Sequence, residues 1–190
     1  MRNSISVQRF GLALFLCGVG CGGTGTTAAP SAAPRDFPAY SGQATTLFDD
    51  RIDGNSVGLA DVATKPRTDP VLRARAQTAE AVARARVATV SVDSTAGKPI
   101  YRLSLDLAGG FLVRRGFTDD RVEISVRPQS PAFGVVKWLD TRLIGRTFIG
   151  FFHRYAGAED IEVKFHLSAD DPDVLAAVRE AAMLREMMGK

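Results

Sequence analysis

The two histidines, His153 and His166, are the side chains best suited to proton transfer or to binding a transition metal. A zinc site needs at least one further ligand, and the two cysteines, Cys17 and Cys21, stand near the amino terminus. The strand pairing that we predict below puts the histidines on opposite faces of a sheet, so we do not expect them to share a metal. We expect His153 to be partly buried in the core, and His166 to be an exposed sheet residue near Lys164.

A short acidic stretch is similar at first sight to a calcium-binding loop. Its oxygen-bearing side chains are Asp49, Asp50, Asp53 and Asn55, with Gly54 between the last two. The EF-hand order requires oxygen ligands at alternate positions and a glutamate at the twelfth. Counted from Asp49, the third position is Arg51 and the twelfth is not a glutamate. The stretch is therefore expected to be a turn with solvated carboxylates.

The sequence has few of the residues and motifs that covalent catalysis or nucleotide binding requires. The mature part has no spare thiol and no phosphate loop ending in Gly-Lys-Ser or Gly-Lys-Thr. The aspartate pairs at 119–120 and 170–171 stand where turns and helix caps favour carboxylates. We therefore expect no catalytic residue, no metal and no cofactor, and predict that the protein is not an enzyme.

A local basic stretch indicates a possible binding surface. The candidate interaction surface consists of Arg73, Arg75, Arg84 and Arg86, and Arg67 precedes it. Near a membrane, each such arginine gains up to about 1 kcal/mol from phosphate-bearing headgroups or lipopolysaccharide. The alternative is a solvated helix and strand face that has no partner.

The amino-terminal residues have the order of a bacterial export signal. Arg2 and Arg9 precede a short apolar run that ends in Gly18, Val19, Gly20 and Cys21. The run is too short for a permanent transmembrane helix, which needs about 20 apolar residues. It is therefore expected to be removed, and an ordinary cleaved secretory signal is one possibility.

The residues before Cys21 also resemble the lipobox of bacterial lipoproteins, in which the cysteine thiol is acylated by diacylglycerol and becomes the new amino terminus. Gly20 matches that pattern, whereas Gly18 stands where leucine is usual. The resemblance implies a lipid anchor at Cys21 and a place in the cell envelope. Gly22 after the cysteine favours the outer membrane over the inner one.

Removal of residues 1–20 from the 190-residue chain leaves 170 residues, which suits one domain. Two of the 24 basic residues lie in that leader, so 22 remain against 21 acidic ones and the mature net charge is about +1. This balance predicts no nucleic-acid partner. If Cys21 is acylated, no thiol is left for a disulfide, and stability must come from apolar burial.

Composition divides the mature chain into three parts. Residues 21–38 are rich in Gly, Thr, Ala, Ser and Pro and are expected to be a lipidated flexible tether. Residues 39–68 have scattered apolar side chains and are expected to form an extended segment that docks on the domain. Residues 69–190 are expected to be a single domain, which begins with a helix from Asp69 to about Thr78 because Asp-Pro is a strong helix start.

The domain has the patterns of five strands and two further helices. Strands are predicted at 87–92, 100–107, 121–127, 146–155 and 161–167, and a last helix at 172–188. Ser130-Pro131 can cap a further short helix, which would carry Phe133, Val136 and Leu139. Helix propensity competes with the strand pattern at 81–86. A five-residue loop, 156–160, would pair Tyr155 with Ile161 and Phe151 with Phe165, and would put Arg154 opposite Glu162.

These elements predict an α+β, mainly β fold: a small five-stranded antiparallel OB-like barrel with a short inter-strand helix, a preceding helix and a C-terminal helix. The order resembles the OB-type barrel of netrin-like and metalloproteinase-inhibitor modules over about 79–167. The resemblance is one of pattern, and it implies an interaction module.

Four runs resemble an uncharacterised family of Gram-negative bacterial lipoproteins: LFDDRIDGNSVGL, DPVLRARAQTAEAVARARVATVSV, RLIGRTFIGFFHRY and VKFHLSADDPDVLAAVREA. Some members are described as substrate-binding components of a cobalamin importer, although 170 residues with one small barrel differ from the two-lobed clamp of such proteins. The first hypothesis is a non-enzymatic envelope lipoprotein that presents the barrel to a protein or glycan partner. The second is a periplasmic small-ligand carrier or importer component, and an enzyme is the third.

Overall fold

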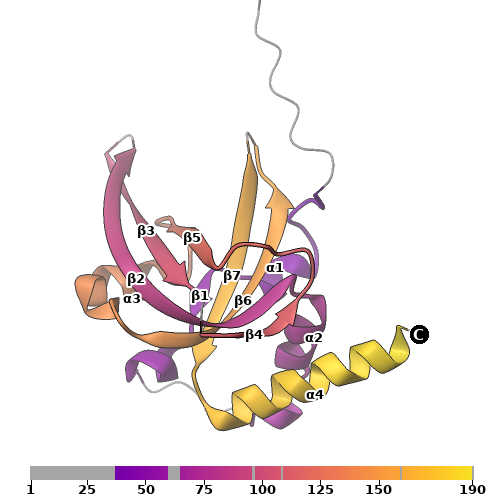
Figure 1. Ribbon diagram of the computed structural model, residues 1–190. Helices are drawn as coiled ribbons and strands as arrows, with labels where there is room; N and C mark the ends of the chain where they lie inside the picture. Colours follow the sequence, from indigo (N-terminus) through magenta and orange to yellow (C-terminus); the bar gives the residue numbers. More distant parts are fainter. Residues whose placement is uncertain (1–36, 60–64, 96, 108, 159, 190) are drawn as a thin grey trace, which may run out of the picture. The chain divides into compact units, whose positions relative to one another are not determined.

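The computed structural model describes residues 37–59, 65–95, 97–107, 109–158 and 160–189, which form an α+β fold (Figure 1). Cys21 and the predicted leader and tether lie outside these residues, apart from Phe37 and Pro38. The α-helices are α1 (Ala44–Leu47), α2 (Pro70–Thr78), α3 (Phe133–Leu139) and α4 (Pro172–Met188). The 3₁₀ helices are η1 (Gly54–Val57), η2 (Pro66–Thr68) and η3 (Asp140–Leu143). The strands are β1 (Arg51–Ile52), β2 (Ala81–Thr95), β3 (Lys98–Asp106), β4 (Phe111–Arg114), β5 (Arg121–Val126), β6 (Thr147–Ala156) and β7 (Ile161–Ala169).

The described strands form one mixed sheet that does not close into a barrel. Its order is β1-β7-β6-β2-β3-β5, and β4 pairs with β2. The expectation of five antiparallel strands is corrected, because β1 and β4 join the sheet and β1 runs parallel to β7. Strands of two and four residues are too short to show an alternating pattern, so they could not be found from the sequence.

Strand β2 connects the two parts of the sheet and is long and curved in Figure 1. Its first half pairs with β6 on one edge and β4 on the other, and its second half pairs with β3. The register with β3 shifts between Val87 and Thr89, as at a β-bulge, and a bulge bends a strand. Pairing on both edges explains why residues 81–86 are strand despite their helix propensity.

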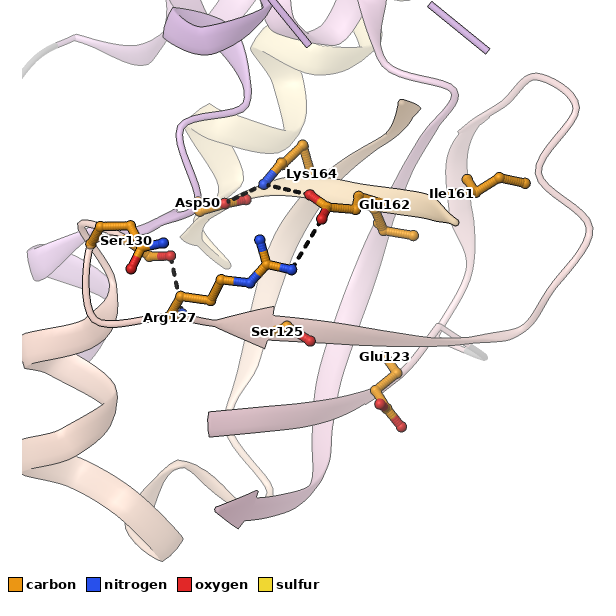
Figure 2. Close-up of a pocket in the computed structure, with 10 residues that line it drawn as sticks. Asp50, Glu123, Ser125, Arg127, Ser130, Ile161, Glu162 and Lys164 are labelled. Carbon is orange, nitrogen blue, oxygen red and sulfur yellow. Dashed lines mark hydrogen bonds and ion pairs between the residues drawn. The ribbon is translucent and has the colours of Figure 1, made fainter. Parts of the chain in front are cut away.

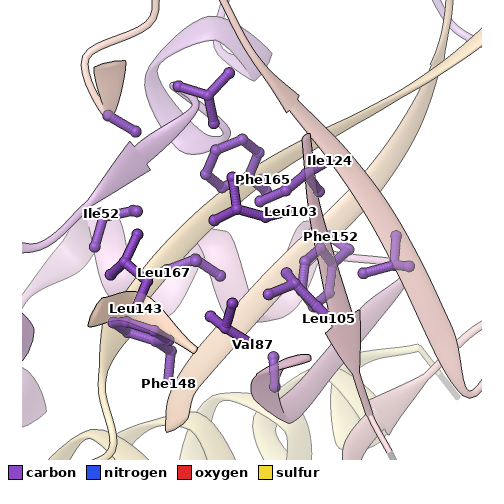
Figure 3. Close-up of a cluster of buried hydrophobic side chains, with 14 of the residues drawn as sticks. Ile52, Val87, Leu103, Leu105, Ile124, Leu143, Phe148, Phe152, Phe165 and Leu167 are labelled. Carbon is purple, nitrogen blue, oxygen red and sulfur yellow. The ribbon is translucent and has the colours of Figure 1, made fainter. Parts of the chain in front are cut away.

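The sheet is covered on both faces at β6, at the first residues of β2 and at the end of β7, whereas β3 and β5 each have one exposed face. One face packs in a core with Leu103, Ile124, Phe152 and Phe165, shown in Figure 3, and with the buried side of α3 and η3. The other face packs on α1, α2 and α4; its core includes Val82, Phe151 and Tyr155 from the strands and Leu47, Leu72 and Val178 from the helices. A sheet buried on both faces must carry apolar side chains at consecutive positions, which is what β6 does.

The β6–β7 hairpin exists, but the predicted register is wrong by one residue. The structure pairs Ala156 with Ile161, Phe152 with Phe165 and Phe151 with His166. Because both faces of β6 are apolar, matching apolar residues could not distinguish the two registers. The shift turns the even-numbered residues of β7 to the face that carries Phe151, so His153 and His166 share a face instead of lying on opposite ones.

Two of the three predicted helix caps are confirmed, at Asp69 and Asp171. The third, Ser130-Pro131, is wrong, because α3 begins at Phe133 and its N-cap Ala132 makes no side-chain hydrogen bond. The Asp69 side chain accepts a hydrogen bond from Val71 N (2.8 Å), and Asp171 accepts one from Asp173 N (2.7 Å). The 172–188 helix is confirmed with the predicted bounds. In the described part of the chain, no helix combines the length and the apolar character needed to cross a membrane.

Replacement of Gly150 by alanine is expected to destabilise the fold by about 1–3 kcal/mol, because it overpacks the core. A Cβ at this position would overlap the buried ring of Phe152 and lie 3.2 Å from Ala85 Cβ. Urea unfolding measures the change. The matched control is Gly134→Ala in α3, where a Cβ meets nothing within 4 Å, and a gain of about 0.5–1 kcal/mol is expected. Equal stability of the two variants would contradict this account of the β6 packing.

Candidate functional site

A polar cavity of about 380 Å³ lies beside β7, between the turn around β1 and the helices α2 and α4. We call it the His166 cavity. Its lining residues are Thr46, Asp49, Arg51, Asp53, Asn55, Pro66, Asp69, Val71, Leu72, Arg75, His166, Ser168 and Val174. Its volume is within the range of small-molecule sites, about 300–1,000 Å³.

His166 is the centre of the charged groups in this cavity. It is 4% exposed, so the expectation of an exposed sheet residue is wrong. Its Nδ1 lies 2.8 Å from Asp49 Oδ1 and its Nε2 lies 3.1 Å from Asp53 Oδ1. Both contacts are hydrogen bonds only if both ring nitrogens carry a proton, as in the imidazolium form. The imidazole ring therefore lies between two carboxylates, one at each ring nitrogen.

The two carboxylates are held in the ionised form. Burial would raise the pKa of Asp49, but the hydrogen bond and charge of His166, with Arg75 and Arg51, outweigh it and lower that pKa. Burial likewise opposes ionisation of Asp53, and its pKa is lowered by His166, the Ser168 hydroxyl and Arg75. The expected turn with solvated carboxylates is therefore corrected: these acids are paired.

Arg75 is a buried arginine that lines the same cavity. It is 6% exposed, its Nε donates to the carbonyl oxygen of Leu47, and its guanidinium lies 5.8 Å from the centre of the Phe151 ring. Burial lowers its pKa, against the opposing charges of Asp49, Asp53 and a third aspartate, Asp69. A fixed guanidinium facing three carboxylates makes this wall of the cavity a preformed set of hydrogen-bonding groups.

The candidate arginines do not form one surface. Arg75 lines the His166 cavity, and Arg73 is exposed on α2. Arg84 and Arg86 are exposed on β2, where Arg84 Nε donates to Asp170 Oδ1 at 3.0 Å. Alternate residues of one strand share a face, so Arg84 and Arg86 lie together on β2.

A second polar cleft, of about 200 Å³, lies where β5 and β7 approach each other without pairing (Figure 2). Lys164 Nζ lies 3.1 Å from Asp50 Oδ2 and 3.2 Å from Glu162 Oε2. Arg127 Nη2 lies 3.0 Å from Glu162 Oε1 and so connects the two strands. Burial raises the pKa of Asp50, and Lys164 opposes this effect. These ion pairs neutralise the charges in the cleft, and the pair between Arg127 and Glu162 crosses the open edge.

His153 is partly buried, as expected, and its ring stacks on Tyr155 with centroids 4.5 Å apart. Its Nδ1 lies 2.9 Å from the carbonyl oxygen of Arg154. Burial is the largest cause that raises the pKa of both Tyr40 and Tyr155 to about 12, so these phenols stay protonated. This histidine is part of an aromatic cluster rather than of the His166 cavity.

A serine motif lies next to the cavity, and it bears on the expectation that the chain has no catalytic residue. Residues 54–58, Gly-Asn-Ser-Val-Gly, match the Gly-x-Ser-x-Gly pattern of hydrolases. A nucleophile elbow places its serine at a strained strand-to-helix turn, but Ser56 lies in η1, is not among the described residues with positive φ, and donates to Asp53 O. The atom opposite His166 Nε2 is an Asp53 oxygen, so the serine is not aligned with the histidine.

The aspartates flank the short strand β1, which explains how they reach β7. Asp49 precedes β1 and Asp53 follows it, while β1 pairs Arg51 with His166 and Ile52 with Leu167. No sequence signal identifies a two-residue strand. Among the described residues, no group of three or more His, Cys, Asp or Glu is arranged to hold a metal ion.

No model of a known protein family matches this chain, and a search of curated proteins finds no significant match.

Asp53→Asn is expected to lower the free energy of unfolding at pH 7 by about 1–2 kcal/mol, because it removes one of the charges that neutralise His166. Since the pKa of Asp53 is lowered in the folded state, its contribution is present above about pH 4 and is lost as the pH falls through the lowered value. The variant should therefore lose less stability than wild type between about pH 5 and pH 3 in urea unfolding.

The control for this experiment is Asp93→Asn, which removes a carboxylate from an exposed ion pair with Arg102 on β2 and β3. Exposed pairs contribute about 0–1 kcal/mol, so this variant should follow wild type at all pH values. If the free energy of unfolding fell by the same amount between about pH 5 and pH 3 in wild type and in the Asp53 variant, the pairing with His166 would have no energetic role.

Proposed function

We propose that this chain is a non-enzymatic, lipid-anchored protein of the Gram-negative cell envelope, attached through Cys21 to the outer membrane, and that its folded domain binds a protein or glycan partner. The observation that carries the binding role is the His166 cavity, where paired donors and acceptors on β7 and around β1 face aliphatic side chains of α2 and α4. Such a wall suits ligands that combine hydroxyl or amide groups with apolar patches.

The electrostatics of the cavity favour recognition over proton transfer. A general base works best with a pKa near the operating pH, whereas Asp49 and Asp53 have lowered values and are poor proton acceptors. The Ser168 hydroxyl contributes to ionising Asp53, so it is not paired with His166 as a nucleophile would be. These groups hold charge in place, which is useful for orienting a ligand.

The curvature and the open edge of the sheet also support an OB-like interaction module. OB-type barrels are partly open, and they bind extended ligands on the strand face and adjoining loops. Here the sheet curves at the bulge of β2 and stays open between β5 and β7. The alternative function, a periplasmic small-ligand carrier or an importer component, is favoured by the same cavity volume of about 380 Å³.

The anchor is tested by mass spectrometry of the mature amino terminus after expression of the full chain in a Gram-negative host. The expected terminus is Cys21 carrying diacylglycerol, and Cys21→Ser should release the protein from the membrane fraction. An unmodified terminus at any other residue would exclude the anchor.

The partner is tested by photo-crosslinking in intact cells, with benzoylphenylalanine at Val71 on the rim of the His166 cavity. The control position is Val92, which is exposed on β2. We expect a defined product from position 71 and none from 92, and co-sedimentation of the full chain with purified peptidoglycan sacculi if the partner is glycan.

Asp53→Asn should weaken either interaction by about tenfold, the equivalent of one charge-assisted hydrogen bond. No product from position 71, no binding to sacculi, and a co-purifying small molecule in native mass spectrometry would favour the carrier instead.

A further inference from the structure

The connection from β5 to β6 carries apolar side chains that the fold does not use. Helices α3 and η3 bury Val136, Leu139 and Leu143 against the sheet. On the outer side, Trp138 is 57% exposed and Ile144 is 47% exposed. One exposed apolar side chain is ordinary, but a tryptophan and an isoleucine exposed within seven residues of one connection are a candidate for an interaction site.

Cations surround these two residues. The Arg142 guanidinium lies 4.9 Å from the centre of the Trp138 ring, and Arg146 Nε lies 3.3 Å from the carbonyl oxygen of Arg142. Arg86 reaches the same place from β2, since its Nη2 lies 3.7 Å from where a Cβ on Gly145 would be. We call this the Trp138 surface; its residues are Arg86, Lys137, Trp138, Arg142, Ile144 and Arg146.

Few negative charges oppose these cations. Asp140 is the one acidic residue in the sequence from 133 to 146, against Lys137, Arg142 and Arg146. Arg86 has Asp106 as its Cα partner on β3. The surface therefore has a local excess of positive charge although the mature chain is nearly neutral.

The surface is also held in shape. Arg142 donates through Nε to Leu139 O at 3.2 Å and through Nη2 to Trp138 O, which fixes the guanidinium beside the indole. Gly145 N donates to Val87 O at 2.8 Å and Val87 N donates to Arg146 O at 3.0 Å, which ties the connection to β2. A preorganised surface loses little entropy on binding.

We propose that the Trp138 surface docks on an anionic lipid bilayer. Tryptophan concentrates at the membrane interface because its ring is apolar and its N–H is polar, and arginines near the surface gain from anionic headgroups. The exposed Ile144, in the same connection, adds apolar surface that fits that interface. The contact belongs to the folded domain and does not depend on acylation of Cys21, but it would supply a second membrane signal beside a lipid chain.

A second exposed apolar group, at the end of α4, serves this purpose less well. Met183, Met187 and Met188 are exposed there, and they lie among both signs of charge, with Arg185 and Glu186 beside them. An anionic surface would repel the glutamate. The observations therefore favour the α3 side for membrane contact.

Trp138 is the single tryptophan of the chain, so its fluorescence reports directly on this surface. The experiment uses the full chain with Cys21→Ser, which removes any lipid anchor, and vesicles of phosphatidylglycerol mixed with phosphatidylcholine. We expect a blue shift of the emission with these vesicles and none with pure phosphatidylcholine. High salt should reverse the shift, because it screens the headgroup charges.

Arg142→Gln/Arg146→Gln should weaken partitioning onto the anionic vesicles about tenfold or more, since each arginine near the surface contributes about 1 kcal/mol. The matched control, Lys98→Gln/Arg179→Gln, removes the same charge from exposed positions on β3 and α4 and should bind as the parent does. Should the Arg142 variant fold poorly, Lys137→Gln/Arg146→Gln keeps the Arg142 side chain and its contacts with Trp138 and Leu139, and should weaken binding similarly.

No shift at saturating anionic lipid would overturn the proposal, and so would an equal loss of binding in both double variants. A shift with soluble polyglutamate as large as that with vesicles would assign the surface to an acidic protein instead. All these results are independent of whether Cys21 is acylated and whether the His166 cavity binds a partner.

Discussion

Burial of both faces of β6, and of the parts of β2 and β7 that pair with it, is the constraint on which the other features depend. Because helices α1, α2 and α4 cover the face of β7 that carries even-numbered residues, His166 and Ser168 are taken out of water. A buried imidazole and hydroxyl need hydrogen-bond partners. The segment around β1 supplies them, with Asp49 and Asp53 on either side of a two-residue strand that pairs with β7. The amino-terminal part of the fold is thus tied to the sheet by charge as well as by apolar packing.

The same sheet has two edges that approach each other without joining. Strand β2 bends at its bulge and brings the β5 edge toward β7, where Arg127 and Glu162 form an ion pair across the opening. Charged side chains at an open edge discourage pairing with another chain. Lys164 and Asp50 extend the row of charges along β7. The open edge is therefore protected by polar groups, whereas a closed barrel would have needed none.

How far the sequence predicts this structure depends on the kind of signal. Asp69-Pro70 and Asp171-Pro172 are local signals, and the helices that they start are where we expect them. The register of β6 against β7 depends on tertiary packing. Phe151 and Phe152 are both buried, so the apolar pattern of β6 does not show which of them faces Phe165. One residue of shift was enough to put His166 on the wrong face. The candidate site was missed for that reason, and because β1 is too short to leave a pattern.

The proposed Trp138 surface and the His166 cavity are built mainly on opposite faces of one sheet, although Arg86 reaches the Trp138 surface from the face that carries Phe151. Helices α3 and η3, which carry Trp138, pack on the face with Phe152 and Phe165, while the His166 cavity lies on the face with Phe151. None of the residues of the Trp138 surface lines the His166 cavity. A partner could reach Asp53 and Val71 without displacing the membrane contact, so the two interactions do not compete for the same surface.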